Sequence, residues 1–325
     1  MTPFKPLYSY TFRFLPLKAE RYMFLIIMIL VFVKPPIRHA SETEWYWENN
    51  YVVNVELEYN PCAEIEDSQG EMQINQTRLR SLFPVIMKEN FFFGLGAVYE
   101  GYLLNYRDTP SFYNDSAGKF VYQEDLPNDL HIIDVVIGTN YTFNEQWGIY
   151  GEIIPGIHSD FEDIDNSDML VNGFFFLRYH AESGTEYRFG GGVTPSFGEP
   201  QVFPLFGMLC PVSEKYAFDL LLPSHAMFRF KCSEKTEMGL KAKMSIREFR
   251  LQDGGSWHDD ILRYRQVTAG PYAEFILYKT MILRVESGYM LGRKFEFLNK
   301  GYDEQLWVDR LNNKFFLILS LRWAI

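Results

Sequence analysis

Long segments in which apolar and polar residues alternate are the feature that most restricts the fold of this chain. Between residues 51 and 60 every odd position is apolar, while Asn54, Glu56 and Glu58 occupy even positions. The same alternation recurs in residues 238–247 and 281–292. A period of two places one set of side chains on each face of a β-strand. Strands of soluble sheets cluster at about five or six residues, whereas a tilted strand that crosses a bilayer needs about 9 to 11. The lengths here favour membrane-crossing strands.

From residue 41 onward no apolar run is long enough for a membrane helix, so a membrane protein of this sequence would have to be a barrel. We therefore predict an all-β fold, an antiparallel transmembrane β-barrel of about fourteen strands, with twelve as the alternative count. The predicted strands are 51–60, 71–87, 91–106, 130–143, 146–158, 168–181, 185–196, 201–212, 215–222, 225–232, 236–250, 261–278, 280–295 and 313–324.

The predicted connections alternate between tight turns and long loops. Residues 88–90, 144–145, 182–184, 213–214, 233–235 and 279 form the turns, and most connections on the other rim are long, as in 61–70, 107–129, 159–167, 251–260 and 296–312. Short turns on one rim and long loops on the other are typical of outer-membrane barrels. With an even number of strands, both termini emerge on the short-turn side.

The two ends of the chain carry targeting signals. Residues 1–21 are basic and precede an apolar stretch from Met23 to Val33, which is too short to span a bilayer. We predict a signal peptide over 1–40, cleaved after Ala40, and a barrel domain over 41–325; an uncleaved anchor is the alternative. At the other end every second residue from Phe315 to Ile325 is apolar, which predicts a last strand that the barrel-assembly machinery recognises. Barrels of this kind usually end in Phe rather than Ile.

The composition excludes several classes of protein. The formal net charge is -11 and becomes -16 when residues 1–40, with six basic residues and one acid, are removed. An acidic chain without a basic stripe is not a nucleic-acid binder. The 47% hydrophobic content excludes a disordered chain. Three cysteines without metal-like spacing predict neither a disulfide framework nor a metal site. No cofactor is expected, and the oligomeric state is left open.

The polar face of the strands supplies the candidate functional residues. If the apolar set faces lipid, the opposite set lines the lumen, and its charged members are Glu56, Glu58, Glu100, Asp134, Glu152, Arg178, His180, Arg188, Lys241, Lys243, Arg247, Glu274, Arg284, Glu286 and Arg322. Two interpretations are open: a constriction whose opposed charges select a solute, or a network of ion pairs that fills the interior.

Three other features have functional and structural interpretations. The acidic segment 160–168 could hold Ca²⁺ or Mg²⁺ or be a solvated loop, and its spacing matches no EF-hand. Ser224 with His225, or Ser256 with His258 and Asp259, could form a hydrolase site, although neighbouring residues on a strand point to opposite faces. Aromatic residues beside the turns predict girdles at the membrane borders: Trp45, Tyr46, Trp47, Tyr51, Phe91, Phe92, Phe93, Tyr141, Phe143, Trp147, Tyr179, Tyr278, Phe295, Phe297, Trp307 and Trp323.

Several strand and turn motifs resemble a family of outer-membrane β-barrels of unknown function. They are Leu130–Gly138, Trp147–Glu152 with Pro155–Gly156, Phe189–Val193, Val202–Gly207 and Glu286–Tyr289. The similarity extends over most of residues 50–325 and contains no catalytic motif. It implies a barrel and an outer-membrane location, and nothing about a substrate.

The sequence thus predicts an integral outer-membrane barrel that contacts outer-membrane lipid. Its predicted function is passive passage of a small solute, or a structural or surface role, without catalysis. Two alternatives remain: an outer-membrane lipid hydrolase or acyltransferase, and a soluble secreted lipid-binding β-protein.

Overall fold

The structure, a computed structural model, describes the chain within the compact unit Trp45–Ile325. The described residues are 52–65, 70–107, 112–114, 119–121, 126–194, 196–198, 200–251, 260–278, 281–299 and 305–324. The predicted signal peptide over 1–40 and its cleavage after Ala40 lie outside these residues and stay predictions. None of the helical segments in the described part is long and apolar enough to cross a membrane.

The strands follow one another around the barrel in antiparallel register, except that β1 pairs with β3 rather than β2 and β18 pairs with β16 rather than β17. Their bounds are β1 Val52–Tyr59, β2 Ala63–Glu64, β3 Glu71–Lys88, β4 Phe91–Arg107, β7 Asp129–Thr142, β8 Trp147–Ser159, β9 Met169–His180, β10 Glu186–Val193, β11 Val202–Pro211, β12 Tyr216–Leu222, β13 His225–Ser233, β14 Thr236–Arg250, β15 Ile261–Tyr278, β16 Met281–Leu298, β17 Gln305–Leu311 and β18 Lys314–Ala324. A separate hairpin pairs β5 Phe112–Asn114 with β6 Lys119–Val121.

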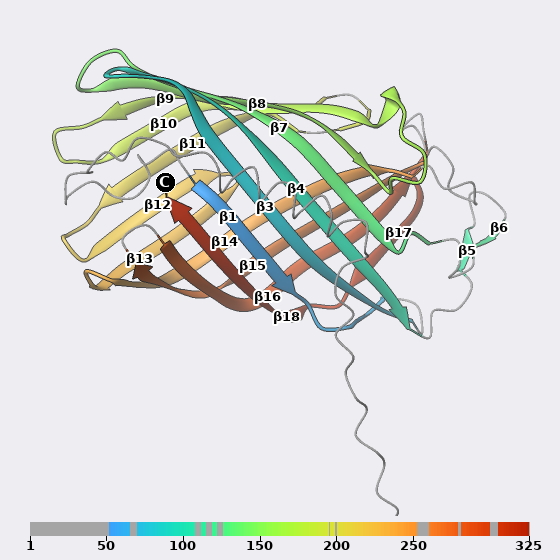
Figure 1. The fold of residues 1–325 in the computed structure, drawn as a ribbon. Helices are drawn as coiled ribbons and strands as arrows, with labels where there is room; N and C mark the ends of the chain where they lie inside the picture. Colours follow the sequence, from blue (N-terminus) through green and yellow to red (C-terminus); the bar gives the residue numbers. More distant parts are fainter. Residues whose placement is uncertain are drawn as a thin grey trace, which may run out of the picture. The chain divides into compact units, whose positions relative to one another are not determined.

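The main sheet closes on itself because β1 pairs with both β3 and β18. The sheet has 16 strands, but β2 continues β1 across residues 60–62, and β17 continues β18 across residues 312–313. Fourteen strands therefore close the barrel (Figure 1). The two interruptions face each other, since Ile65 bridges to Leu311 and the Asn312 backbone N–H donates to Glu64 O at 3.0 Å.

The predicted fold class is confirmed, and each of the fourteen predicted strands corresponds to one strand of the barrel. The prediction of a loop over 296–312 is wrong in part, because β16 extends to Leu298 and β17 pairs with it. The short turns lie together on one rim, at the left of Figure 1, and the longer connections lie on the other. We call the corresponding parts of the barrel the turn half and the loop half.

The outer face of the barrel is apolar in the turn half and around the middle, and charged on β14 to β16 near the long loops. Exposed side chains such as Ile153, Val171 and Phe175 cover the apolar part, as the alternation predicts. Near the short turns aromatic rings follow one another around this face: Tyr141 lies beside Phe143, and the ring of Trp147 is tilted against that of Tyr179 with centroids 4.8 Å apart. Rings at such a border match the girdles of membrane barrels.

Three residues predicted for the girdles point inward instead. Phe92 is 5% exposed, and Phe295 and Phe297 are each 1% exposed. Phe92 lies on the inward side of its strand. The two β16 residues point inward because the register with β15 shifts between Arg265 and Val267, where Gly292 has a φ of +59°. One extra residue in a strand moves every following side chain to the other face.

Candidate functional site in the barrel interior

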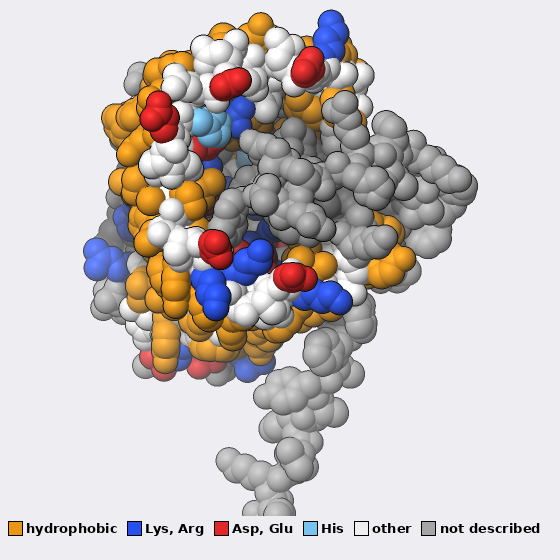
Figure 2. All heavy atoms as spheres, turned by 90° about the vertical axis from the view of Figure 1, so that its left-hand side faces the viewer, with side chains coloured by type: hydrophobic (Ala, Val, Ile, Leu, Met, Phe, Trp, Pro, Cys, Tyr) orange, Lys and Arg blue, Asp and Glu red, His pale blue; other side chains and the backbone are white. Residues whose placement is uncertain are grey.

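The strand register places the predicted charged residues on the inner face of the barrel. Figure 2, which looks onto the rim of short turns, shows apolar side chains around the outside and charged side chains within the opening. The inner charges form groups that link neighbouring strands, and one group links strands on opposite sides.

The first group lies on β9 to β13. Arg188 donates through Nε to Glu186 at 2.6 Å and through a terminal nitrogen to Asp219 at 3.2 Å. Arg229 approaches the other oxygen of Asp219 at 3.6 Å, and Asp219 is fully buried. His180 lies 3.2 Å from Glu186 and is partly exposed at the turn rim. Arg178 belongs to the same group, because it lies 3.9 Å from Glu186 and donates to Asn140 at 2.5 Å.

The second group lies on β14, β16, β15 and β18. Lys241 Nζ contacts both oxygens of Glu286, at 2.6 and 2.9 Å. Arg284 contacts Glu286 at 3.3 Å and also pairs with Glu274, which Arg322 approaches at 3.7 Å. The alternation of charge along this row leaves each carboxylate beside at least one cation. Glu56 of β1 accepts a hydrogen bond from Ser320 at 3.4 Å.

The third group lies on β3, β7 and β8. Arg80 donates to both oxygens of Glu152, at 2.6 and 2.8 Å, and Tyr150 donates to the same carboxylate. Asp134 contacts His158 Nε2 at 2.9 Å, and the other ring nitrogen of His158 lies 3.2 Å from the backbone oxygen of Glu248. Because Glu248 belongs to β14, this last contact already reaches a distant part of the wall.

The fourth group crosses the interior. Arg247 of β14 donates to both oxygens of Glu100 of β4, at 2.8 and 2.9 Å. Arg78 approaches Glu100 at 3.1 Å, and the Tyr102 hydroxyl donates to it at 2.8 Å. The strand order separates β4 and β14 by several strands in either direction. The pair is therefore a bridge between opposite walls, and Glu100 is only 2% exposed. Glu58 lies in the same region and accepts from Gln266 at 3.3 Å.

Between this bridge and the rim of long loops, the interior is apolar. We call this cluster the loop-side core; its buried members are Ala63, Ile65, Met72, Ile74, Tyr102, Leu104, Leu126, Leu130, Ile132, Phe249, Leu251, Leu262, Tyr264, Phe295, Phe297 and Leu311. Tyr102 and Phe249 meet edge to face with ring centroids 5.2 Å apart, again between β4 and β14. The loop-side core fills the interior where the opposite walls come together.

The strands explain why the walls meet there. β10 to β13 are short, and β14 extends beyond the last residue that pairs with β13. At its end Arg250 bridges to Ser159 of β8. In the loop half the wall therefore consists of β14, β15, β16, β17, β2, β3, β4, β7 and β8, whereas all fourteen strands form the turn half. Phe197 belongs to the connection between β10 and β11, and its backbone N–H donates to the Glu248 carboxylate of β14 at 3.1 Å.

The sequence analysis missed Arg78, Arg80, Glu186, Asp219 and Arg229 as members of these groups. Arg78 and Arg80 share the even positions of their strand with Met72 and Ile74, so the period of two could have identified them. Lys243, which was predicted, is half-buried and makes no ion pair within 4 Å in the described part of the chain.

The remaining candidates have these positions. In the acidic segment, Asp165 caps a short 3-10 turn by accepting the Ser167 backbone N–H at 2.5 Å. Ser224 and His225 do meet, with Oγ 3.4 Å from Nδ1, so the expectation that they point apart is wrong. They can meet because Ser224 lies in the turn that precedes β13 rather than within the strand. Ser256, His258 and Asp259 lie outside the described residues.

The closed antiparallel barrel, apolar outside and charged inside, defines this chain as a protein of the transmembrane β-barrel class. Residues 112–323 match the model of a family described as a domain of unknown function (DUF6268), and the chain belongs to that family. The predicted resemblance to a barrel family of unknown function is thus confirmed. No curated protein matches the sequence.

Solved barrels are similar to the chain at low identity. A mutant of the TodX monoaromatic hydrocarbon channel is 11% identical, with a TM-score of 0.40 and coverage of 85% of this chain and 90% of that chain. An outer-membrane channel from Pseudomonas putida F1 is 8% identical, with a TM-score of 0.41 and coverage of 89% and 100%. The outer membrane phospholipase of Salmonella typhi is 7% identical, with a TM-score of 0.31 and coverage of 83% and 90%. At these values the function has to be inferred from the chain's own residues.

Proposed function

We propose that the protein is an integral barrel of the bacterial outer membrane that passes a small polar solute passively, with the loop-side core as its constriction. The observation that carries this proposal is the interior of the turn half, where charged side chains from many strands line the inner face. A polar inner face with an apolar outer face is what a water-filled passage through a bilayer needs. The apolar exterior and its aromatic border support the membrane location.

The loop-side core supplies the gate in this proposal. Hydrophobic constrictions exclude water and so close a channel until the walls move apart. The Tyr102 and Phe249 rings lie in the interior on the loop side of the Glu100–Arg247 bridge. The ring contact and the bridge both connect β4 with β14. A solute would be held among the charges of the turn half and would cross when β4 and β14 separate.

Reconstitution of the full chain in planar bilayers tests the proposal. We expect small, infrequent conductance steps from the unaltered protein, and larger ones from Phe249→Ala and from Leu130→Ala, because both changes remove side chains from the loop-side core. Phe175→Ala, which alters an exposed outward residue, is the control and should leave the steps unchanged. If the protein and both core variants conduct nothing, passage is excluded and a structural or surface role remains.

A lipid hydrolase is the second candidate, because Ser224, His225 and Asp219 form a chain of contacts. Ser224 Oγ lies 3.4 Å from His225 Nδ1, and His225 Nε2 lies 3.7 Å from Asp219. A nucleophile, a base and an orienting acid are the parts of such a site. Asp219, however, also faces Arg188 and Arg229, and both contacts in the chain are long. For these two reasons we propose passage of a solute as the function and keep hydrolysis as the second candidate.

A fluorophosphonate probe and a phospholipase assay in mixed micelles distinguish this candidate. Hydrolysis predicts labelling and fatty-acid release that Ser224→Ala abolishes and that Ser213→Ala, in a short turn, leaves intact. Absence of labelling in the unaltered chain, or equal labelling in Ser224→Ala, removes the hydrolase.

A further inference from the structure

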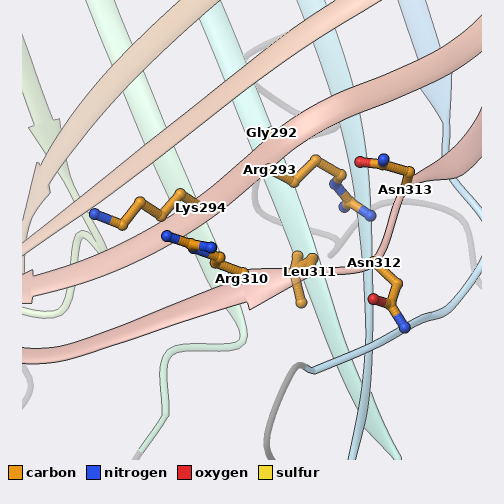
Figure 3. A pocket seen from close by; sticks show the side chains of 7 residues that line it. All are labelled: Gly292, Arg293, Lys294, Arg310, Leu311, Asn312 and Asn313. Atoms are coloured by element: carbon orange, nitrogen blue, oxygen red, sulfur yellow. The ribbon is translucent and has the colours of Figure 1, made fainter.

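The wall of the loop half changes strand partners at two places. At the first, β16 passes from β18 to β17 beside a cavity of about 440 Å³ (Figure 3). Two cations there have partners in the wall itself, since Lys294 contacts Glu296 at 2.6 Å and Arg293 donates to the Tyr264 hydroxyl at 3.3 Å. At the second, β8 and β14 lose β9 and β13 and meet each other. This second place contains a side chain whose protonation matters.

The contact between β8 and β14 closes the loop half and is narrow. Among the described residues, the ladder between these strands is a single bridge from Arg250 to Ser159. The neighbouring His158 reaches from β8 to β14, because its Nδ1 lies 3.2 Å from the backbone oxygen of Glu248. His158 is only 2% exposed. Its ring is therefore part of the contact that joins the two strands.

Both ring nitrogens of His158 face acceptors. Nε2 lies 2.9 Å from Oδ1 of Asp134, and Nδ1 faces the Glu248 carbonyl. A carbonyl oxygen and an ionised carboxylate only accept hydrogen bonds, whereas a neutral imidazole has a single N–H. Two hydrogen bonds therefore need one proton more than a neutral ring and a carboxylate carry, on either His158 or Asp134.

The surroundings of Asp134 favour this extra proton. Asp134 is 7% exposed, and within the described ranges no cation other than His158 lies within 4 Å of it. A buried carboxylate without a countercharge is costly, so a charged His158 or a protonated Asp134 stabilises the pair. The other charged groups on the elements packed here are Glu100 of β4, Asp160 of β8, Asp168 of the short 3-10 turn, Arg247, Glu248 and Arg250 of β14, and Arg263 of β15. Arg247 is bound to Glu100, and Arg263 to Glu248.

His131 of β7 provides a contrast. Its Nε2 also lies beside a carboxylate, 3.2 Å from Asp129, and its Nδ1 lies 3.2 Å from the Tyr99 hydroxyl. A hydroxyl can donate as well as accept, so a neutral His131 makes both contacts. The two histidines differ in whether the second partner can supply a proton.

We propose that His158 and Asp134 hold one extra proton while β8 and β14 are joined, and that loss of this proton loosens the loop half. A neutral ring would keep its N–H on the carboxylate, which is the stronger acceptor, and would turn a lone pair towards the Glu248 oxygen. The contact between β8 and β14 should therefore weaken as the pH rises. The proposal does not require passage of a solute through the barrel.

The experiment measures urea unfolding of the full chain in vesicles of uncharged lipid, from about pH 5 to pH 8, where an imidazole titrates. It compares the unaltered protein with Asp134→Asn, His158→Gln and the control His131→Gln. An asparagine can donate its amide N–H to Nε2, so a neutral His158 makes both contacts in Asp134→Asn. His158→Gln carries no titrating group at this position.

The folding equilibrium constant of the unaltered protein, divided by that of His158→Gln, should fall as the pH rises, by up to about tenfold per pH unit, because folding takes up a proton. The same ratio for Asp134→Asn should rise, since only its unfolded state then binds that proton. His131→Gln should retain most of the fall. If His158→Gln does not fold, the unaltered protein and Asp134→Asn still have to change in opposite directions relative to each other. A ratio for the unaltered protein that is flat or rises with pH, or one that changes in parallel with Asp134→Asn, overturns the proposal.

Discussion

The two halves of the barrel differ on both faces. The exterior of the turn half is apolar, whereas the outer face of β14 to β16 in the loop half carries ion pairs such as Arg263 with Glu248 and Arg265 with Glu296. In the turn half the inner face carries charged residues, and in the loop half it carries the loop-side core. The change takes place along single strands. On β14 the inner residues run from Lys241 to Arg247 and then to Phe249, and on β16 they run from Arg284 and Glu286 to Phe295.

This difference shows that the number of strands decides what the interior must contain. A wall of fourteen strands encloses more space than side chains can fill, so its lining is polar, whereas a wall of fewer strands closes until side chains fill it. The bridge from Arg250 to Ser159 marks the level at which β9 to β13 no longer separate the walls. The two halves should therefore respond differently to substitution.

The largest expected effect is on the loop-side core. Phe249 is fully buried, so Phe249→Ala should lower the free energy of unfolding by about 3 to 5 kcal/mol. Urea titration of the protein folded in lipid vesicles measures this. Phe175→Ala, at an outward residue that is 56% exposed, should cost much less. Equal costs at the two positions would mean that the loop half is not packed as a core.

A smaller effect is expected at the border between the halves. Glu100→Gln leaves Arg247 and Arg78 without their carboxylate, and we expect a loss of about 3 kcal/mol. The double variant Glu100→Gln with Arg247→Met should recover part of this loss, because one of the unpaired charges is then gone. The same urea titration reports both values. Additive losses in the double variant would show that the bridge does not couple the two walls.

The sequence predicted the strands and the two rims well because alternation of side chains is local. Each predicted strand has a counterpart in the barrel, and the aromatic rings of Tyr141 and Trp147 lie beside the turns as expected. Where the alternation shifts, prediction failed: Phe295 and Phe297 point inward because a register shift at Gly292 cannot be read from composition. β17 was missed because residues 305–311 lie within the segment predicted as the loop 296–312.

The interior could be predicted only as a list of residues. Which charges meet depends on contacts between strands that are far apart in sequence, as with Glu100 and Arg247, which are 147 residues apart. The lengths of β10 to β13 did not predict that β14 would pair with β8 and close the loop half. The meeting of Ser224 with His225 depends on where a turn ends, which is the least certain feature of any strand prediction.

The smallest expected effect on stability concerns two lysines on the same inner face of β14. Lys243 makes no ion pair within 4 Å among the described residues, whereas Lys241 contacts both oxygens of Glu286. Lys243→Gln should therefore change the free energy of unfolding by less than about 0.5 kcal/mol, and Lys241→Gln should cost about 1 to 3 kcal/mol. If the turn half is the passage, Lys243→Gln should still shift its selectivity towards cations, because an inner positive charge has been removed. Reversal potentials in asymmetric salt measure this shift. An unchanged reversal potential would mean that permeating ions do not pass Lys243, and the charged interior would then have a structural role.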